Sequence, residues 1–187
     1  PNSMRLVFPR TNLFLGESVG VKEVIQFSDI TLHSNAETGK KADYALLKLN
    51  RMIKRGVLTL SDEGVPDGLE LKLASVTPDG SGSMLGRVSV KSCLSVMASA
   101  IQPSYLSVFS SVISFSDCEL IHGNSGSPLL DSEGKVRAIA HASIDQDQKP
   151  KVMSALSLTR LDDLSLATNA SCIDIPNFHN QVNGDCN

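Results

Sequence analysis

The sequence predicts an all-β protein, and two observations carry this prediction. Hydrophobic residues recur with a period of two in short runs, which is the pattern of half-buried strands. Clusters of turn-forming residues separate the runs, such as Pro-Asp-Gly at 66–68 and Asp-Ser-Glu-Gly at 131–134. Strands that recur roughly every 10–15 residues are typical of a sandwich or of paired barrels.

The individual elements follow from these runs in chain order. The expected strands are residues 19–27, 45–49, 69–74, 87–91, 106–109, 136–140 and 153–158. The turn at 131–134 lies between two apolar runs and is expected to close a hairpin. One helix is expected near the end, because a Thr/Asp capping pattern at 159–162 precedes an apolar stripe of Leu161, Leu164 and Leu166.

Composition excludes several classes of protein. The 187 residues are 41% hydrophobic, which supplies a good-sized core and rules out a disordered chain. The net charge is −3 and aromatic residues make up 4% with no Trp, so we expect no nucleic-acid partner. The apolar runs fall far short of the about 20 residues that a membrane helix needs, so no membrane partner is expected either.

The four cysteines are Cys93, Cys118, Cys172 and Cys186, and they lack the close paired spacing of a zinc site. Four cysteines allow three disulfide pairings, and the sequence does not choose among them. Cys172 and Cys186 bracket a polar tail that a disulfide would hold down, which would leave Cys93 with Cys118. The alternative is four free thiols in a cytosolic protein. We favour the oxidised form and a secreted or periplasmic location.

One segment, residues 122–130, stands apart from the rest. It presents Ser125 between glycines and leads into an apolar strand, as a hydroxyl nucleophile on a tight loop requires. In such a loop the amides of Gly123 and Ser125 can hold a developing oxyanion, and removing one such donor costs about 3–4 kcal/mol of barrier. The alternative is a plain β-turn between strands.

Two anchors give the chain a resemblance to a known family. The motif Gly-Asn-Ser-Gly-Ser-Pro at 123–128 and the strand after it resemble the trypsin/chymotrypsin family of serine peptidases, most closely the bacterial branch of glutamyl endopeptidases. Residues 42–49 look like the segment of that family that carries the aspartate of the catalytic triad, at Asp43. Residues 4–8 look like the strand that follows the histidine segment in that family, and the likeness spans roughly residues 5 to 166.

The resemblance implies a fold, a reaction and a division of the chain. The fold would be two packed six-stranded antiparallel β-barrels with a C-terminal helix. An N-terminal barrel would occupy residues 1–75, incomplete at its start, and a C-terminal barrel residues 76–187. The catalytic residues would be Ser125 and Asp43, with the Gly123 and Ser125 amides as the oxyanion hole and peptides or proteins as substrates. No metal or organic cofactor would be needed.

The histidine base that this chemistry needs is not evident in the sequence. His33 is the only histidine before Asp43, and it is read as a surface-loop residue because its neighbours do not match the family's pattern. We expect the base upstream of residue 1 or on a separate chain, since residues 1–4 look like a cleavage or cloning scar. The alternative is an inactive pseudo-peptidase that binds peptides or proteins, and a third, less favoured class is a cytosolic structural β-domain.

Candidates for substrate contact surround the nucleophile motif. In glutamyl endopeptidases a histidine on the strand after the nucleophile contacts the acidic substrate side chain. Here His141 falls one position late, between Ala140 and Ala142, and would face the wrong side unless a bulge or the length of the 131–134 turn absorbs the shift. Glu119 stands where trypsin-like members carry the acid that selects a basic residue, and His122 adjoins the oxyanion loop. Both of these side chains could equally be ordinary exposed residues, so the cleavage specificity stays open.

Overall fold

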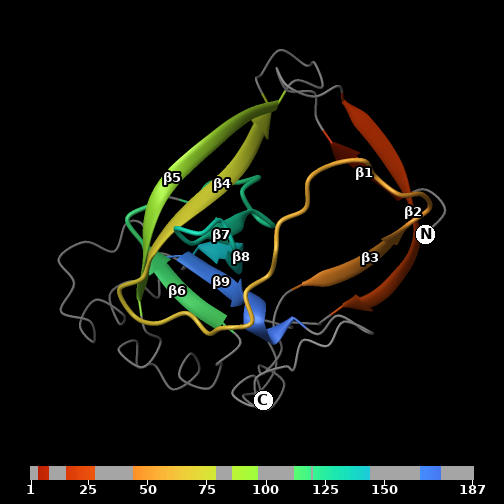
Figure 1. Cartoon of the computed structure of the whole chain (residues 1–187). Coiled ribbons are helices and arrows are strands. Elements are labelled where there is room, and N and C mark those ends of the chain that lie inside the picture. The colour runs from red at the N-terminus through yellow and green to blue at the C-terminus, as the bar shows by residue number, and fades with distance from the viewer. Residues whose placement is uncertain are drawn as a thin grey trace.

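The N-terminal part of the chain forms an open antiparallel sheet (Figure 1). The computed structural model describes residues 4–8, 16–27, 44–78, 86–96, 112–118, 120–143 and 165–173. Within these ranges the sheet contains β1 (Arg5–Phe8), β2 (Glu17–Phe27) and β3 (Ala45–Leu49) in that order. The three expected strands are confirmed, but the described residues do not close them into the six-stranded barrel that we expected.

The C-terminal part forms a closed six-stranded barrel (Figure 1). Every pair of neighbouring strands is antiparallel, in the order β4-β5-β6-β9-β8-β7. The strands are β4 (Glu70–Pro78), β5 (Gly86–Val96), β6 (Val112–Ser116), β7 (Pro128–Leu130), β8 (Val136–Ser143) and β9 (Ser165–Asn169). The expected strands at 69–74, 87–91 and 136–140 are confirmed, whereas those at 106–109 and 153–158 lie outside the described residues. β4 belongs to this barrel along its whole length, across the division expected after residue 75.

The barrel core consists of alternate residues from facing strands. Leu71 and Leu73 of β4, Phe115 of β6, Leu129 of β7 and Ala167 of β9 are all fully buried. Successive side chains of a strand point to opposite faces, so the period-two pattern places one set of each strand inside the closed barrel. Burial of a large apolar side chain such as that of Phe115 contributes about 1.5–3 kcal/mol to the stability of the fold.

The expected C-terminal helix is contradicted where the structure can be compared with it. Ser165 and Leu166 lie in β9, which pairs with β6 on one side and β8 on the other. A short 3₁₀ helix, η2 (Ala170–Cys172), follows this strand. Leu164 and Leu166 are two residues apart, which is the period of a strand and not of a helix face, and two neighbouring strands pair with Leu166. Residues 159–164 lie outside the described part of the chain.

The segment 50–69 connects the sheet to the barrel and contacts both. The Arg55 guanidinium lies 5.2 Å from the centre of the Phe8 ring, a cation–π contact with β1. Further along, the Ser61 amide donates to the Val136 carbonyl at 2.9 Å, beside a parallel bridge to β8. The connection is therefore held against β8, the strand that also faces the motif at 123–128.

Candidate active site

The loop 121–127 is built from two consecutive turns. The Asn124 amide donates to the Ile121 carbonyl at 3.0 Å, and the Ser127 amide donates to the Asn124 carbonyl at 3.0 Å. A second hydrogen bond joins the same two residues, because the Asn124 side-chain Oδ1 accepts from the Ile121 amide at 3.1 Å. Local hydrogen bonds therefore hold the loop on both sides of Ser125.

Strand β8 holds the end of the loop in place. The Gly126 amide donates to the Ala140 carbonyl at 2.7 Å, and the Ala140 amide donates to the Ser127 carbonyl at 2.9 Å. Gly126 has a φ of +86°, a conformation that side-chain-bearing residues rarely adopt. A glycine directly after Ser125 therefore lets the chain turn and enter β7 while Ser125 stays outside the barrel.

Two backbone amides beside the serine hydroxyl have no acceptor in the described part of the chain. They are those of Gly123 and Ser125, which donate to no described residue. Gly123 has a φ of +95°, so its peptide orientation also depends on the absence of a side chain. Unpaired amides next to a hydroxyl are the groups that a negatively charged oxygen would accept hydrogen bonds from.

The Ser125 side chain is exposed, and its hydroxyl has a weak partner. Its Oγ donates to the carbonyl oxygen of His141 at 3.3 Å, longer than an ordinary O–H···O hydrogen bond. Among the described residues no imidazole bonds to this Oγ. The hydroxyl is therefore reachable from solvent and only loosely held.

A β-bulge in β8 sets the position of His141. The register with β9 shifts between Ala140 and Ala142, which makes His141 the extra residue. The His141 ring Nδ1 lies 3.2 Å from the hydroxyl of the fully buried Thr168. A bulge of the kind that could absorb the one-residue shift of His141 therefore occurs here. It directs the His141 ring toward β9, while the His141 carbonyl faces Ser125.

A buried carboxylate organises the turn between β7 and β8. Asp131 is only 6% exposed and accepts from the amides of Glu133 and Lys135, each at 2.9 Å, and from the Arg137 Nε at 2.8 Å. Burial alone would raise the pKa of Asp131, but these amides and the guanidinium outweigh it and lower the pKa from its ordinary value. The network stabilises the start of β8, the strand on which the loop is fastened.

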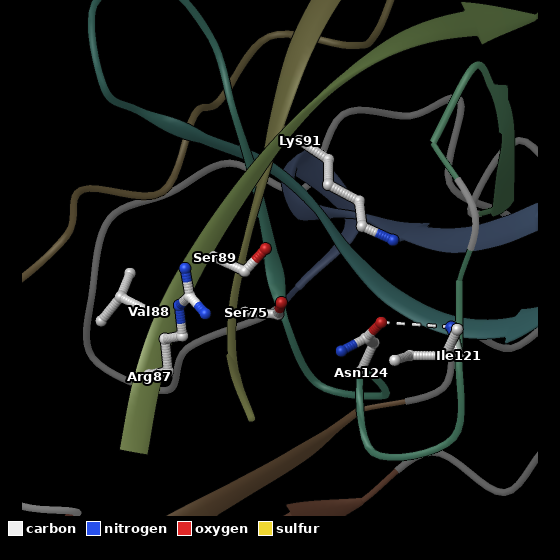
Figure 2. A pocket seen from close by; sticks show the side chains of 7 residues that line it. All are labelled: Ser75, Arg87, Val88, Ser89, Lys91, Ile121 and Asn124. Atoms are coloured by element: carbon white, nitrogen blue, oxygen red, sulfur yellow. Dashed lines mark hydrogen bonds between the residues drawn. The ribbon is translucent and has the colours of Figure 1, made fainter. Parts of the chain in front are cut away.

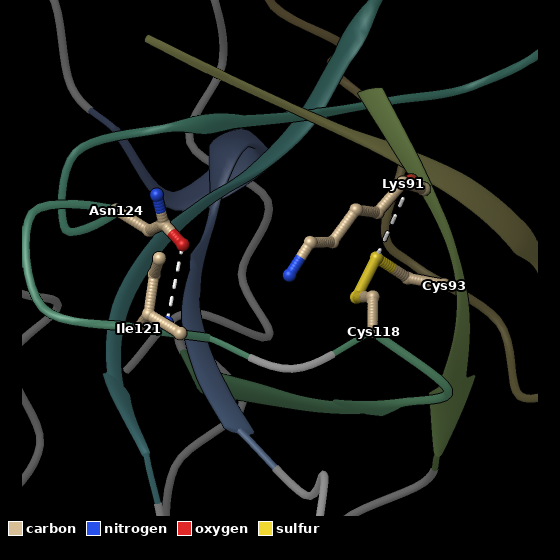
Figure 3. Close-up of a disulfide and its surroundings, with 5 residues drawn as sticks. All are labelled: Lys91, Cys93, Cys118, Ile121 and Asn124. Atoms are coloured by element: carbon tan, nitrogen blue, oxygen red, sulfur yellow. Dashed lines mark hydrogen bonds between the residues drawn. A yellow bond between two sulfur atoms is a disulfide. The ribbon is translucent and has the colours of Figure 1, made fainter. Parts of the chain in front are cut away.

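A disulfide joins Cys93 of β5 to Cys118, just after β6 (Figure 3). Both cysteines are buried in the barrel core, and Cys118 lies a few residues before the serine loop. This confirms one of the two pairs we considered. Cys172 is also disulfide-bonded, and Cys186 lies outside the described residues. The cross-link fixes the point from which the loop leaves the barrel.

A family model of the trypsin-like peptidase domain matches residues 10–139. The chain belongs to this family. No curated protein matches the sequence significantly. The likeness to the bacterial glutamyl-endopeptidase branch therefore stays a hypothesis for this trypsin-like peptidase domain.

Solved structures share the fold of this trypsin-like peptidase domain. The mouse brain serine protease neuropsin matches with a TM-score of 0.58 and 12% identity over 83% of this chain and 68% of its own. A scabies mite inactivated protease paralogue matches with a TM-score of 0.57 and 13% identity, over 87% of this chain and 68% of its own. The inactive form of the Rv3671c protease of M. tuberculosis matches with a TM-score of 0.50 and 16% identity, over 82% of this chain and 63% of its own. The chain thus spans 63–68% of the length of these structures, and at such identities the likeness concerns the fold alone.

Several expected site residues of the peptidase domain cannot be placed. Asp43 and Glu119 lie outside the described residues, as does His33, which the sequence assigns to a surface loop. His122 is exposed at the tip of the loop, as a residue open to a ligand would be. Ala140 is fully buried, so only its backbone faces the loop.

Sequence reasoning missed three polar residues that shape this region. Asn124 and Thr168 are each at most 1% exposed, and Asp131 is the carboxylate of the turn network. An Asp directly before a Ser-Glu-Gly cluster is typical of a side chain that bonds amides two residues on, so Asp131 could have been found. Thr168 has no such signal, because its contact with His141 depends on the bulge.

Neither a metal centre nor a membrane helix occurs in the part of the chain that the structure describes. No three His, Cys, Asp or Glu residues there are grouped so that they could hold a metal ion. No helix in those ranges is long and apolar enough to cross a bilayer.

Proposed function

We propose that this chain carries the nucleophile of a serine endopeptidase and that the nucleophile is Ser125. The supporting observation is the exposed Ser125 hydroxyl on a loop fastened to β8, next to the unpaired amides of Gly123 and Ser125. Acyl transfer requires such a hydroxyl together with amide donors for the oxyanion, and these two amides are the donors we propose.

In the proposed reaction Ser125 Oγ attacks the carbonyl carbon of a peptide bond, and a histidine takes the hydroxyl proton. The Gly123 and Ser125 amides donate to the oxyanion that forms. The C–N bond then breaks, and the histidine returns the proton to the leaving amine. A water molecule next attacks the acyl ester and releases the carboxylic product, which regenerates Ser125.

We propose Asp43 as the residue that orients this histidine and holds it in the correct tautomer. The histidine itself would come from a segment outside these 187 residues, on the same polypeptide or on a separate chain. In support, the weak hydrogen bond from Ser125 Oγ to the His141 carbonyl leaves the hydroxyl able to turn toward an incoming imidazole.

We also propose that the end of β8 contacts the substrate, as in the glutamyl-endopeptidase branch. His141 supports this, because its carbonyl lies 3.3 Å from Ser125 Oγ and its ring is held beside Thr168. Ala140 and Ala142 would flank the substrate backbone, with His122 and Glu119 as further contacts. Comparison of substrates that carry Glu, Gln or Lys before the cleaved bond tests whether His141 selects an acidic residue. A His141→Ala variant that keeps an unchanged Glu preference would contradict that role.

The decisive test is labelling with a fluorophosphonate. We expect the full natural protein, with the segment that supplies the histidine, to form an adduct on Ser125 that peptide mass mapping locates. Ser125→Ala should lose the adduct and about 10⁶-fold in kcat. Ser132→Ala is the matched control, since Ser132 is an exposed serine in the nearby turn, and it should keep both. An unlabelled full protein would rule out the enzyme.

The second candidate is a pseudo-peptidase that uses the same site to bind peptides or proteins. It is favoured by the Ser125 Oγ, whose hydrogen bond in the described structure goes to a backbone carbonyl. Peptide binding by the full protein that is equal for wild type and Ser125→Ala, without labelling, would support this function over cleavage.

We propose an oxidising location, secreted or periplasmic, for this domain. The Cys93–Cys118 disulfide supports it, because cytosolic thiols are mostly kept reduced. Mass measurement of protein isolated from its native source, after alkylation without reductant, should find no free thiol at these two positions. Alkylation of both would contradict the location.

A further inference from the structure

A cavity of about 340 Å³ opens between the β4–β5 hairpin and the first turn of the serine loop (Figure 2). Ser75, Arg87, Val88, Ser89 and Lys91 line it from the hairpin, and Ile121 and Asn124 line it from the loop. Ser125 and His141 are not among the lining residues, so the cavity is separate from the site at the serine hydroxyl. Its volume is at the lower end of the range for small-ligand pockets.

The hairpin turns a polar face into this cavity where a barrel usually presents an apolar one. Cross-strand partners share a face, and the face that carries Leu71 with Cys93 continues as Leu73 with Lys91 and then Ser75 with Ser89. The first residues of this row are buried in the core. Packing against the apolar core does not favour lysine and serine, so we infer that this end of the row contacts polar groups.

The opposite face of the same hairpin end is apolar and exposed. Val76 pairs with Val88, and Val90 pairs with Ala74, while the three valines are between 45% and 61% exposed. On the row that lines the cavity Ser75 is buried and Ser89 and Lys91 are half-buried, whereas Arg87 near the hairpin end is exposed. Val88, although it lies on the valine face, is also among the residues that line the cavity. Three polar residues of the row thus lie toward the barrel although the other face is open to solvent.

Asn124 aims an unpaired donor into the cavity. The residue is 1% exposed, and its Oδ1 already accepts from the Ile121 amide. This bond fixes the orientation of the amide, and Nδ2 is left without a hydrogen-bond partner among the described residues. Figure 2 shows Nδ2 pointing across the cavity toward Ser75 and Ser89. A buried donor without an acceptor costs about 1–3 kcal/mol, so a ligand that accepts from it would be favoured.

The two charged groups that line the cavity are donors as well. Arg87 and Lys91 carry positive charge and cannot accept hydrogen bonds, whereas the two serine hydroxyls adapt to either role. No acidic side chain is among the described lining residues. The matching ligand therefore offers acceptors only, and two cations favour two negative charges.

We propose that this cavity is a binding site for a small doubly charged oxyanion, which accepts from Asn124 Nδ2 and pairs with Arg87 and Lys91. Sulfate and compact dicarboxylates share this chemistry. Because Asn124 directly precedes Ser125, a bound anion would also hold the first turn of the loop. The binding claim does not depend on the proposed peptidase activity.

The test is a titration of ¹⁵N-labelled protein followed through the side-chain amide signal of Asn124. Sodium sulfate and disodium succinate are added in separate arms at constant ionic strength, with sodium chloride as the reference. We expect a saturable shift of the Asn124 Nδ2 signal with at least one dianion and none with chloride. The arm that binds more tightly shows whether an inorganic oxyanion or a dicarboxylate is preferred.

Two charge-neutralising variants give the test its control. Arg87→Gln should weaken binding about fivefold or more, since it removes a charge-assisted contact. Lys72→Gln removes the same charge from an exposed position of β4 outside the cavity and should leave binding unchanged. Equal affinities of the two variants, or a shift that grows linearly or equally with chloride, would overturn the proposal.

A third variant separates this site from the proposed function. Ser125→Ala should bind the anion as the wild type does, because the cavity lining does not include Ser125. Failure of fluorophosphonate labelling would then refute the peptidase and leave the anion site intact. Loss of anion binding in Ser125→Ala would instead show that the anion occupies the serine site, which overturns the separate cavity.

Discussion

Removal of the Cys93–Cys118 disulfide should destabilise the barrel by a calculable amount. The bond links β5 to the residue from which the chain continues toward the serine loop. Replacing both cysteines by alanine removes this cross-link and leaves the disulfide of Cys172 in place. The perturbation is therefore confined to one loop closure and two sulfur atoms in the core.

The magnitude follows from the length of the closed loop. The cysteines are 25 residues apart in sequence, and the chain-entropy relation for a loop of this length gives about 3.5 kcal/mol at 25 °C. The stabilisation arises in the unfolded state, which the bond keeps more compact. We therefore expect both a lower free energy of unfolding and a steeper dependence on denaturant in the variant.

The assay is equilibrium unfolding in urea, followed by far-ultraviolet circular dichroism because the protein has no Trp. Cys93→Ala and Cys118→Ala serve as controls, since each single change already breaks the bond. The two single variants and the double variant should lose nearly the same stability, far less than the sum of the singles. A loss below about 1 kcal/mol in the double variant, or additive single losses, would refute the loop-closure reasoning.

Three further changes test the core, the loop and the turn. Phe115→Ala should lower the free energy of unfolding by about 3–5 kcal/mol, because the ring is fully buried; a loss under about 1 kcal/mol in a urea melt would contradict its place in the core. Gly123→Ala should cost about 1–2 kcal/mol from its φ of +95°, with no steric clash; an unchanged melting temperature would mean that the loop adopts another conformation. Asp131→Asn should cost about 1.5–3 kcal/mol at pH 7, since it weakens charged hydrogen bonds. The folded-state pKa of Asp131 is lowered, so its contribution is present above the unfolded pKa of about 3.9 and is lost as the pH falls through the folded value. The stability difference between wild type and Asp131→Asn should therefore shrink below about pH 4, and a difference that stays constant down to pH 2 would exclude this linkage.

Local patterns were enough to predict most of the described strands. The alternation of apolar and polar residues at 69–74 and 87–91 identifies β4 and β5, and the Asp-Ser-Glu-Gly cluster identifies the turn before β8. The serine loop was likewise predictable, because its glycines adopt the positive φ values that only glycine takes readily. These features depend on neighbours in sequence, so the sequence alone carries them.

Other features arise only when distant strands meet. The capping pattern at 159–162 predicts a helix that would include Leu166, but β6 and β8 offer hydrogen bonds on both sides of Leu166 and make it part of a strand. The bulge at His141 reflects the register between β8 and β9, and no local residue signals it. The sequence by itself thus determined the all-β class, the turn chemistry and the loop that presents Ser125. The tertiary structure alone decided which cysteine pairs with Cys93, which residues of the β4–β5 hairpin line a cavity, and that the side-chain amide of Asn124 is buried there. Each of these features depends on contacts between residues that are far apart in the chain.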